Sequence, residues 1–274
     1  MKNHSHEHLM SLTLVEKIEY SKKIIKDSLS RFSTDELYIA WTGGKDSTTM
    51  LWLFLESCKE SNAAMPKAMF IDEGSVFDEI FTLVNTVKEK WGIEVEIIKN
   101  HDVSDKAADI GDPIYIAELN ERNRKEIEKL EYREKMFPFE PESLVGNHLM
   151  KTVAMNMFIE SNAVKAISTA IRWDEQSARI KEGFFSPRTD PDHIRIQPIL
   201  HFSERNIWSA IHEYRIPFCS LYYQGYRSLG AKGSTTKISD IPAWEQDLEN
   251  TPERVGRGQE KEAIMEQLRD LGYM

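Results

Sequence analysis

The sequence predicts an α/β fold in which a parallel sheet carries helices on both faces. Between residues 36 and 99, short apolar runs alternate with longer stretches of helical periodicity, in the order β-α-β-α-β. Consecutive parallel strands need such crossover helices, and nearly all crossovers are right-handed. The chain has 274 residues, 41% of them hydrophobic, which is enough for one large domain with a substantial core.

The first half of the chain supplies the clearest elements. Residues 11–32 place apolar side chains at helical spacing and predict an amphipathic helix. The short apolar runs predict three strands, at 36–41, 67–71 and 94–99. The longer stretches between them predict two helices, at 48–60 and 76–91.

The second half of the chain has weaker patterns, which place its elements less closely. It predicts an exposed, charged helix at 122–135, a helix at 144–160, a strand at 163–170, a polar connection at 172–188, a strand at 194–199 and a helix at 203–213. Ser203 is the expected N-cap of the last helix, with Asn206 forming an imperfect capping box. We expect residues 1–215 to form a nucleotide-binding α/β domain. Residues 216–274 form a C-terminal extension that closes the site and ends in a charged helix at 259–270.

Composition excludes several classes of protein. Lys and Arg number 35 against 45 Asp and Glu, which gives a net charge of −10 and a pI near 5.4. An acidic chain argues against wrapping nucleic acid, although local basic spots keep that partner possible. There is no long apolar run and no secretory signal, so we expect a cytoplasmic protein without a membrane span. Two cysteines, Cys58 and Cys219, cannot build a disulfide framework.

The most informative segment follows the first predicted strand and reads Thr42-Gly-Gly-Lys-Asp-Ser47. Two glycines let the backbone approach a phosphate, and the following helix N-terminus offers free N–H groups and positive potential. Lys45 adds a full charge, while Thr42 and Ser47 add hydroxyls. The spacing is not that of a Walker A loop.

This order resembles the PP-loop, S-G-G-x-D-S, of the ATP pyrophosphatases, with Thr42 in place of the first serine. The resemblance implies the Rossmann-like adenine nucleotide alpha-hydrolase fold, ATP as ligand and Mg²⁺ as its companion ion. It also implies a set of nucleotide-binding residues: Trp41, Thr42, Gly43, Gly44, Lys45, Asp46, Ser47, Asp72 and Thr169. Asp46 and Asp72 are the candidate metal ligands, and a turn-capping role is the alternative for Asp72.

Two further segments resemble one branch of that superfamily, which holds sulfate adenylyltransferase small subunits and phosphoadenylyl-sulfate reductases. Residues 71–75 resemble its V-D-T-G step, and residues 168–179 resemble its G-x-R-R-D-E-x-x-S-R segment, with Trp173 at the second arginine. The guanidinium group suits sulfate or phosphate oxygens. The candidate anion-binding residues are Arg172, Asp174, Ser177, Arg179, Arg227, Arg254 and Arg257.

The later segments agree with the same branch. Residues 197–208 and 216–222 resemble its P-L-x-x-W-T-E-x-D-I-W and I-P-x-x-P-L-Y signatures. Residues 224–230 resemble the G-Y-x-S-x-G loop of the reductases and of eukaryotic-type FAD synthetase. Residues 253–274 resemble the C-terminus of sulfate adenylyltransferase small subunits, with Gln259-Glu260 and Met274 as departures.

Two departures from these relatives bear on function. Reductase chemistry needs a C-terminal cysteine thiolate, and no cysteine follows Cys219. The chain also has only about 20 residues between Gly230 and Glu253, where the adenylyltransferase subunits carry a longer insert. The resemblance implies a GTPase large subunit as partner, but the missing insert puts this partner in doubt, and a second copy of the chain is the alternative.

The resemblance implies adenylyl transfer from ATP, most closely to sulfate, with release of pyrophosphate. Lys45, Asp46, Arg172 and Arg179 are the expected catalytic residues. Three alternatives stay open: FAD synthesis, nucleic-acid thiolation by a protein that lacks the reductase cysteine, and a non-catalytic nucleotide-binding subunit.

Overall fold

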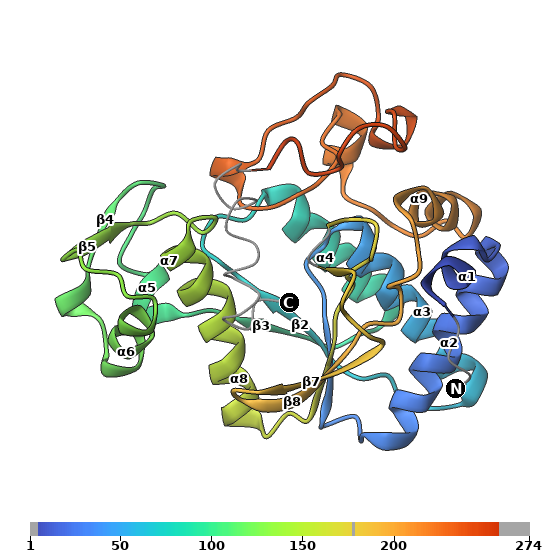
Figure 1. Ribbon diagram of the computed structural model, residues 1–274, viewed down its shortest axis with the longest axis horizontal. Helices are drawn as coiled ribbons and strands as arrows, with labels where there is room; N and C mark the ends of the chain where they lie inside the picture. Colours follow the sequence, from blue (N-terminus) through green and yellow to red (C-terminus); the bar gives the residue numbers. More distant parts are fainter. Residues whose placement is uncertain (1–4, 177–178, 258–274) are drawn as a thin grey trace.

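A six-stranded sheet organises the protein, as a computed structural model shows for residues 5–176 and 179–257 (Figure 1). The strand order is β3-β2-β1-β6-β8-β7. The strands are β1 (Leu37–Ala40), β2 (Ala68–Ile71), β3 (Val95–Ile98), β6 (Ala166–Ser168), β7 (Phe185–Thr189) and β8 (Asp192–Ile196). The first five in this order pair in parallel, which confirms the predicted parallel sheet.

Strand β7 corrects the prediction that residues 172–188 are only a polar connection. It pairs antiparallel with β8 at the edge of the sheet. An edge strand needs little apolar surface and tolerates proline, here Pro187, so the apolar pattern that reveals a central strand is missing.

Most of the helices match the predicted ones with shifted ends, but those at His6–Ser11 and His101–Ser104 were not predicted. The helices in the described residues are α1 (His6–Ser11), α2 (Leu14–Arg31), α3 (Lys45–Ser61), α4 (Asp78–Trp91), α5 (His101–Ser104), α6 (Glu121–Lys129), α7 (Leu144–Asn147), α8 (Ala154–Asn162) and α9 (Glu204–Glu213). A π-helical stretch, His148–Val153, joins α7 to α8. The predicted helix at 11–32 begins only at Leu14, because Thr13 caps α2 in a complete capping box with Glu16.

Two expectations about the later helices need correction. The capping box of α9 is complete, because the amide oxygen of Asn206 accepts from the Ser203 backbone N–H. The charged helix expected at 122–135 ends at Lys129. The chain then forms β5 (Met136–Pro138), which pairs antiparallel with the earlier strand β4 (Pro113–Tyr115), and both strands are too short for a sequence pattern to reveal.

Helices cover both faces of the sheet, as predicted. Ile39 and Phe70 pack into the core formed with α2, α3, α4 and α9. Tyr38 and Met69, one position earlier on the same strands, pack against α8 on the opposite face. This alternation follows from the two-residue period of a strand, and it leaves the strand ends free to carry a ligand.

The chain after residue 215 crosses the domain as an extended segment with short 3-10 turns, orange to red at the top of Figure 1. The predicted helix at 259–270 lies outside the described residues, and the division of the chain at residue 216 stays a prediction. Among the residues that the structure describes, no helix has the length and apolar character needed to cross a membrane.

The sheet order fixes where a ligand can bind. From β1 the chain first builds outward to β2 and β3, and then returns to place β6 and β8 on the other side of β1. The crevice at the carboxyl ends of β1 and β6 is therefore the topological switch point, where open α/β sheets bind ligands. Thr42–Ser47 and Thr169–Arg172 follow these two strands directly.

Candidate active site

The turn after β1 is tight because of Gly43. Its φ is +71°, a conformation that side chains with a Cβ rarely adopt. A Cβ at this position would lie 2.8 Å from Cγ2 of Ile80 on α4. Glycine therefore lets the turn pack directly on α4 and present Gly44 as the N-cap of α3.

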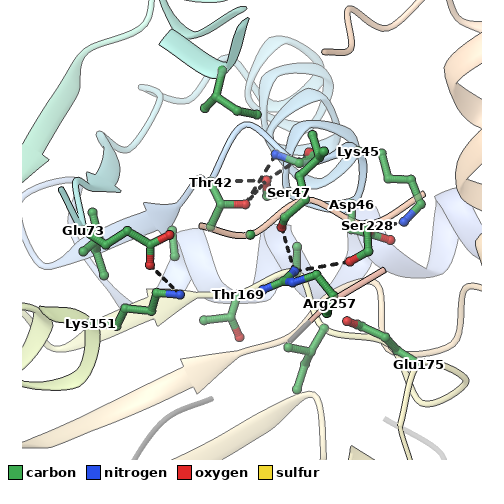
Figure 2. A pocket seen from close by; sticks show the side chains of 18 of the residues that line it. Thr42, Lys45, Asp46, Ser47, Glu73, Lys151, Thr169, Glu175, Ser228 and Arg257 are labelled. Carbon is green, nitrogen blue, oxygen red and sulfur yellow. Dashed lines mark hydrogen bonds and ion pairs between the residues drawn. The ribbon is translucent and has the colours of Figure 1, made fainter. Parts of the chain in front are cut away.

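Hydroxyl groups and one distant tyrosine fix the turn. The hydroxyls of Thr42 and Ser47 lie 3.1 Å apart, and Ser47 Oγ accepts from the Thr42 backbone N–H (Figure 2). The backbone N–H of Lys45 donates to the hydroxyl of Tyr222, at 3.0 Å. Burial raises the pKa of Tyr222, so this hydroxyl is neutral. The C-terminal segment thus orients the start of α3.

A cavity of about 290 Å³ opens in front of this turn. One part of its wall is apolar and includes Ala40, Phe70, Ile71, Met155 and Ile171. The rest carries charge. Of the described residues, six cationic and four acidic side chains line the cavity, so this part of its wall is net positive in a chain of net charge −10: Lys45, Lys151, Arg179, Arg195, Arg254 and Arg257 against Asp46, Glu73, Glu175 and Glu253.

Four charged side chains close a ring beside the turn. Lys45 Nζ lies 3.0 Å from Asp46 Oδ2, and the other Asp46 oxygen pairs with Arg172. Arg172 pairs in turn with one oxygen of Glu253, whose second oxygen pairs with Lys45. Lys45 and Arg172 are fully buried, and although burial alone would lower their pKa values, the carboxylates raise them well above normal. Both cations stay charged.

A second set of cations lies across the cavity. Arg179 and Arg254 share the carboxylate of Glu175, with Arg254 at 3.0 Å. Arg257 donates to the Leu229 carbonyl at 2.7 Å and to Ser228, and it contacts Glu142 at 3.2 Å. Figure 2 shows Arg257 beside Ser228 in the cavity wall. Three guanidinium groups thus line the same cavity as the glycine turn.

The structure brings most predicted site residues to one cavity. Nine of them line it: Thr42, Gly44, Lys45, Asp46, Ser47, Thr169, Arg179, Arg254 and Arg257. Trp41, Gly43 and Arg172 lie directly behind this wall: Trp41 is buried and donates its indole N–H to Thr48, and Arg172 reaches the site through Asp46 and Glu253.

Three predicted residues are placed elsewhere, and a fourth lies outside the described residues. Asp72 accepts the Gly74 backbone N–H at 2.9 Å, which is the turn-capping alternative, and it is not among the described residues that line the cavity. Asp174 instead holds Arg172 and the N-terminus of α9. Arg227 is buried on Glu204, at 2.8 Å. Ser177 is the residue outside the described part of the chain.

Sequence reasoning missed several residues of this site. Lys151 lies 2.5 Å from Glu73 and 2.9 Å from Glu142, and the first pair faces the cavity (Figure 2). Its signal was present, since Lys151 is the one charged residue between Ser143 and Ile159. Glu253 precedes the predicted Arg254, but nothing local indicates that its carboxylate returns to Lys45.

Comparison with known sequences shows to which family the chain belongs. The phosphoadenosine phosphosulfate reductase domain matches residues 36–237, which include the turn after β1, the β6 end and most of the cavity wall. The chain belongs to this family. Its two thiols are nonetheless buried, and burial raises the pKa of both Cys58 and Cys219 to about 11, so neither supplies a thiolate near neutral pH.

Relatives of this phosphoadenosine phosphosulfate reductase domain protein are adenylyltransferases. The sulfate adenylyltransferase subunit 2 of Maricaulis maris is 25% identical over 230 residues, which cover 76% of this chain and 66% of that protein. A probable FAD synthase of Caenorhabditis briggsae is 22% identical, over 83% of this chain and 35% of that protein. The chain thus spans less than two thirds of the length of these curated relatives.

A solved structure supports the fold. The FMN adenylyltransferase of Candida glabrata, in complex with FMN and an ATP analogue, superposes with a TM-score of 0.60 at 20% sequence identity. The match covers 94% of this chain and 79% of that one. It shows the same α/β architecture with helices on both faces of a mostly parallel sheet.

Proposed function

We propose that this protein is a nucleotidyltransferase that transfers the adenylyl group of ATP to an oxyanion and releases pyrophosphate. The observation that carries the proposal is one cavity, at the switch point of the sheet, whose wall combines two kinds of surface. The glycine turn, the α3 N-terminus and the Lys45–Arg172 ring provide hydrogen-bond donors and cations, and Phe70, Ile71 and Met155 provide apolar surface. A nucleoside triphosphate needs both, donors for its phosphates and apolar surface for its base.

The chemistry of the cavity wall decides how ATP lies in the cavity under this proposal. The β- and γ-phosphates bind at Thr42–Ser47, where backbone N–H groups and hydroxyls donate hydrogen bonds to the phosphate oxygens. The base then lies against Phe70, Ile71 and Met155. Thr169, whose buried hydroxyl has no hydrogen-bond partner in the described part of the chain, borders this space.

The residues present do not fit a magnesium ion held by the protein. Both oxygens of Asp46 are engaged by Lys45 and Arg172, and Asp72 caps its own turn. Within residues 5–176 and 179–257, no three metal-ligating side chains gather into a site. We therefore treat Mg²⁺ as part of the Mg-ATP substrate, since this ion prefers phosphate oxygens and water.

The reaction needs no proton transfer. An oxygen of the acceptor oxyanion attacks the α-phosphorus in line, the bond from that phosphorus to the bridging oxygen breaks, and pyrophosphate leaves with the electron pair. Lys45 and the α3 N-terminus neutralise the leaving group, and Arg179, Arg254 and Arg257 hold the acceptor. Such positioning and charge neutralisation supply most catalysis at phosphoryl centres.

Sulfate is the acceptor that we favour. The cavity, at about 290 Å³, is at the low end of the roughly 300–1,000 Å³ typical of ligand sites, so beside a nucleotide it suits a small acceptor. The Maricaulis relative is named a subunit, and we propose that this chain also works with a second subunit, of the GTPase class in the sulfate pathway.

Flavin mononucleotide is the second candidate acceptor. Ser228, Leu229 and Gly230 line the cavity, and they belong to the segment that resembles FAD synthetases. The Caenorhabditis relative agrees with this alternative.

The test is phosphate produced from Mg-ATP in the presence of inorganic pyrophosphatase, with no acceptor, sulfate, flavin mononucleotide or bulk tRNA. We expect sulfate-dependent release that Lys45→Ala abolishes and that Lys26→Ala, an exposed lysine on α2, leaves intact. Release only with flavin or tRNA would reject sulfate as the acceptor. ATP binding without release for any acceptor, even with a partner subunit added, would reject adenylyl transfer and favour a non-catalytic nucleotide-binding subunit.

A further inference from the structure

Glu253 differs from the other members of the charge ring in where it comes from. Lys45 and Asp46 begin α3, and Arg172 follows β6, so all three sit at strand ends of the sheet. Glu253 comes from the C-terminal segment, 208 residues after Lys45. Its side chain is 7% exposed and lines the cavity beside the phosphate-binding turn.

The Glu253 carboxylate occupies hydrogen-bond donors that an incoming phosphate needs. Carboxylate and phosphate oxygens both accept, and the Lys45 ammonium already has Asp46 and Glu253 as partners, with Glu204 at 4.0 Å. Burial alone would raise the pKa of Glu253, but Arg172 and Lys45 hold it well below its ordinary value. The carboxylate is therefore a permanent competitor at neutral pH.

We infer that Glu253 determines which oxyanion the phosphate-binding turn accepts: it holds Lys45 and Arg172 against a single oxyanion such as sulfate or inorganic phosphate, and it gives way to a pyrophosphate-bearing ligand. This inference rests on the proposed function, in which the acceptor and the leaving group are both oxyanions. Without such discrimination, the acceptor would occupy the leaving-group site.

The contacts explain the discrimination. A single oxyanion would exchange the Glu253 contacts for equivalent ones, and it competes with a tethered carboxylate whose effective concentration is on the order of millimolar or higher. Pyrophosphate spans further and adds the hydroxyls of Thr42 and Ser47 and those N–H groups at the start of α3 that do not donate to Tyr222. Only the larger anion forms enough new hydrogen bonds to outweigh the contacts that Glu253 loses.

Calorimetric titration of the full chain tests this, with sulfate, inorganic phosphate and pyrophosphate each used alone. We expect wild type to bind pyrophosphate and to bind sulfate weakly. In Glu253→Gln, sulfate and phosphate should bind roughly tenfold tighter or more, because one charged competitor for these donors is gone. Pyrophosphate should also bind tighter. Glu249→Gln is the control, since Glu249 lies in the same segment and pairs with Arg205 on the exposed surface.

Glu253→Asp is the variant to titrate if Glu253→Gln does not fold. The shorter side chain keeps its charge but cannot reach both cations, so sulfate affinity should fall between wild type and the Gln variant. Unchanged sulfate affinity in the folded variants, or weaker pyrophosphate binding, would overturn the inference and make Glu253 a positioning residue. These titrations need no turnover, so a missing adenylyl-transfer activity would reject the proposed function without changing their outcome.

Discussion

Gly230 and Arg257 are in such close contact that a side chain on the glycine would displace the guanidinium. A Cβ on Gly230 would lie 2.3 Å from Arg257 Nη2, and both residues line the cavity. Gly230 has an ordinary backbone conformation, so its role is steric. The absence of a side chain at Gly230 thus sets where Arg257 points.

Replacing Gly230 by alanine should therefore weaken acceptor binding without unfolding the protein. We expect the KM for the acceptor to rise roughly tenfold, the equivalent of one misplaced charge-assisted hydrogen bond, with little change in melting temperature. Gly183→Ala is the matched control, because the nearest atom to its added Cβ is the Phe185 carbonyl oxygen at 3.9 Å. Equal kinetics for the two variants would contradict the steric role.

Gly43→Ala should lower both stability and ATP affinity. The substitution adds left-handed backbone strain of about 1–2 kcal/mol and a clash with Ile80. Gly92→Ala carries the strain alone, since its φ is +61° and nothing lies within 4 Å of an added Cβ. Urea unfolding should show a larger loss for Gly43→Ala, and ATP titration should be affected only there. A Gly92→Ala loss of the same size would show that the Ile80 contact relaxes freely.

Arg254→Gln should slow transfer by about 10²–10³ in kcat/KM, the usual cost of removing one preorganised charge from a closed site. Arg254 lies 3.0 Å from Glu175 in the cavity wall. Arg205→Gln is the comparison, because Arg205 pairs with Glu249 on the exposed surface and should change the rate little. Steady-state kinetics at saturating ATP measures kcat/KM for the acceptor in both variants. A normal value for Arg254→Gln would show that this residue does not bind the acceptor.

Stability should fall as the pH drops below about 6.5, because two histidines are buried in their neutral form. Burial lowers the pKa of His201 to about 3 and that of His193 to about 4, both below the ordinary histidine value of about 6.5. Below about pH 6.5 the unfolded chain binds protons that the folded chain does not. Each histidine therefore contributes a loss of about 1.4 kcal/mol per pH unit, until the pH reaches its folded pKa.

Urea unfolding from about pH 7 to about pH 5 measures this slope. His201→Phe keeps an aromatic ring among Tyr20, Phe184 and Phe202, and its slope should be shallower by one proton. Buried carboxylates such as Glu126, whose pKa is lowered to about 2 chiefly by its hydrogen bond with His148, add a loss at more acidic pH. An unchanged slope in His201→Phe would show that His201 does not remain neutral in the fold.

Sequence patterns predicted the part of the molecule that is built from local signals. The strand before Thr42 and the helix after it are each recognisable from a short window, and the parallel order follows from their alternation. The edge strand β7 and the β4–β5 pair have no recognisable apolar pattern, because short or polar strands pair through backbone groups alone.

The site residues also divide into those that a local pattern predicts and those that it does not. Thr42, Lys45 and Ser47 are close in sequence and were predicted together. Glu253 and Tyr222 reach the cavity through tertiary contacts that cross more than a hundred residues, and no local spacing reports such a contact. Asp72 shows how a strand-end position leaves two roles open, since one of its carboxylate oxygens caps the next turn and its ligand role stays a prediction.

The bond from the Lys45 backbone to Tyr222 has a consequence for synthesis of the protein. A ribosome makes the glycine turn before the rest of the site, and β1, β2 and β3 can assemble before β6 and β8 are made. The hydroxyl that orients the turn is added 177 residues later, and the ring waits for residue 253. A nascent chain therefore passes through a stage with part of the sheet but without a finished anion site, and competence to bind is acquired only after residue 253 has been made.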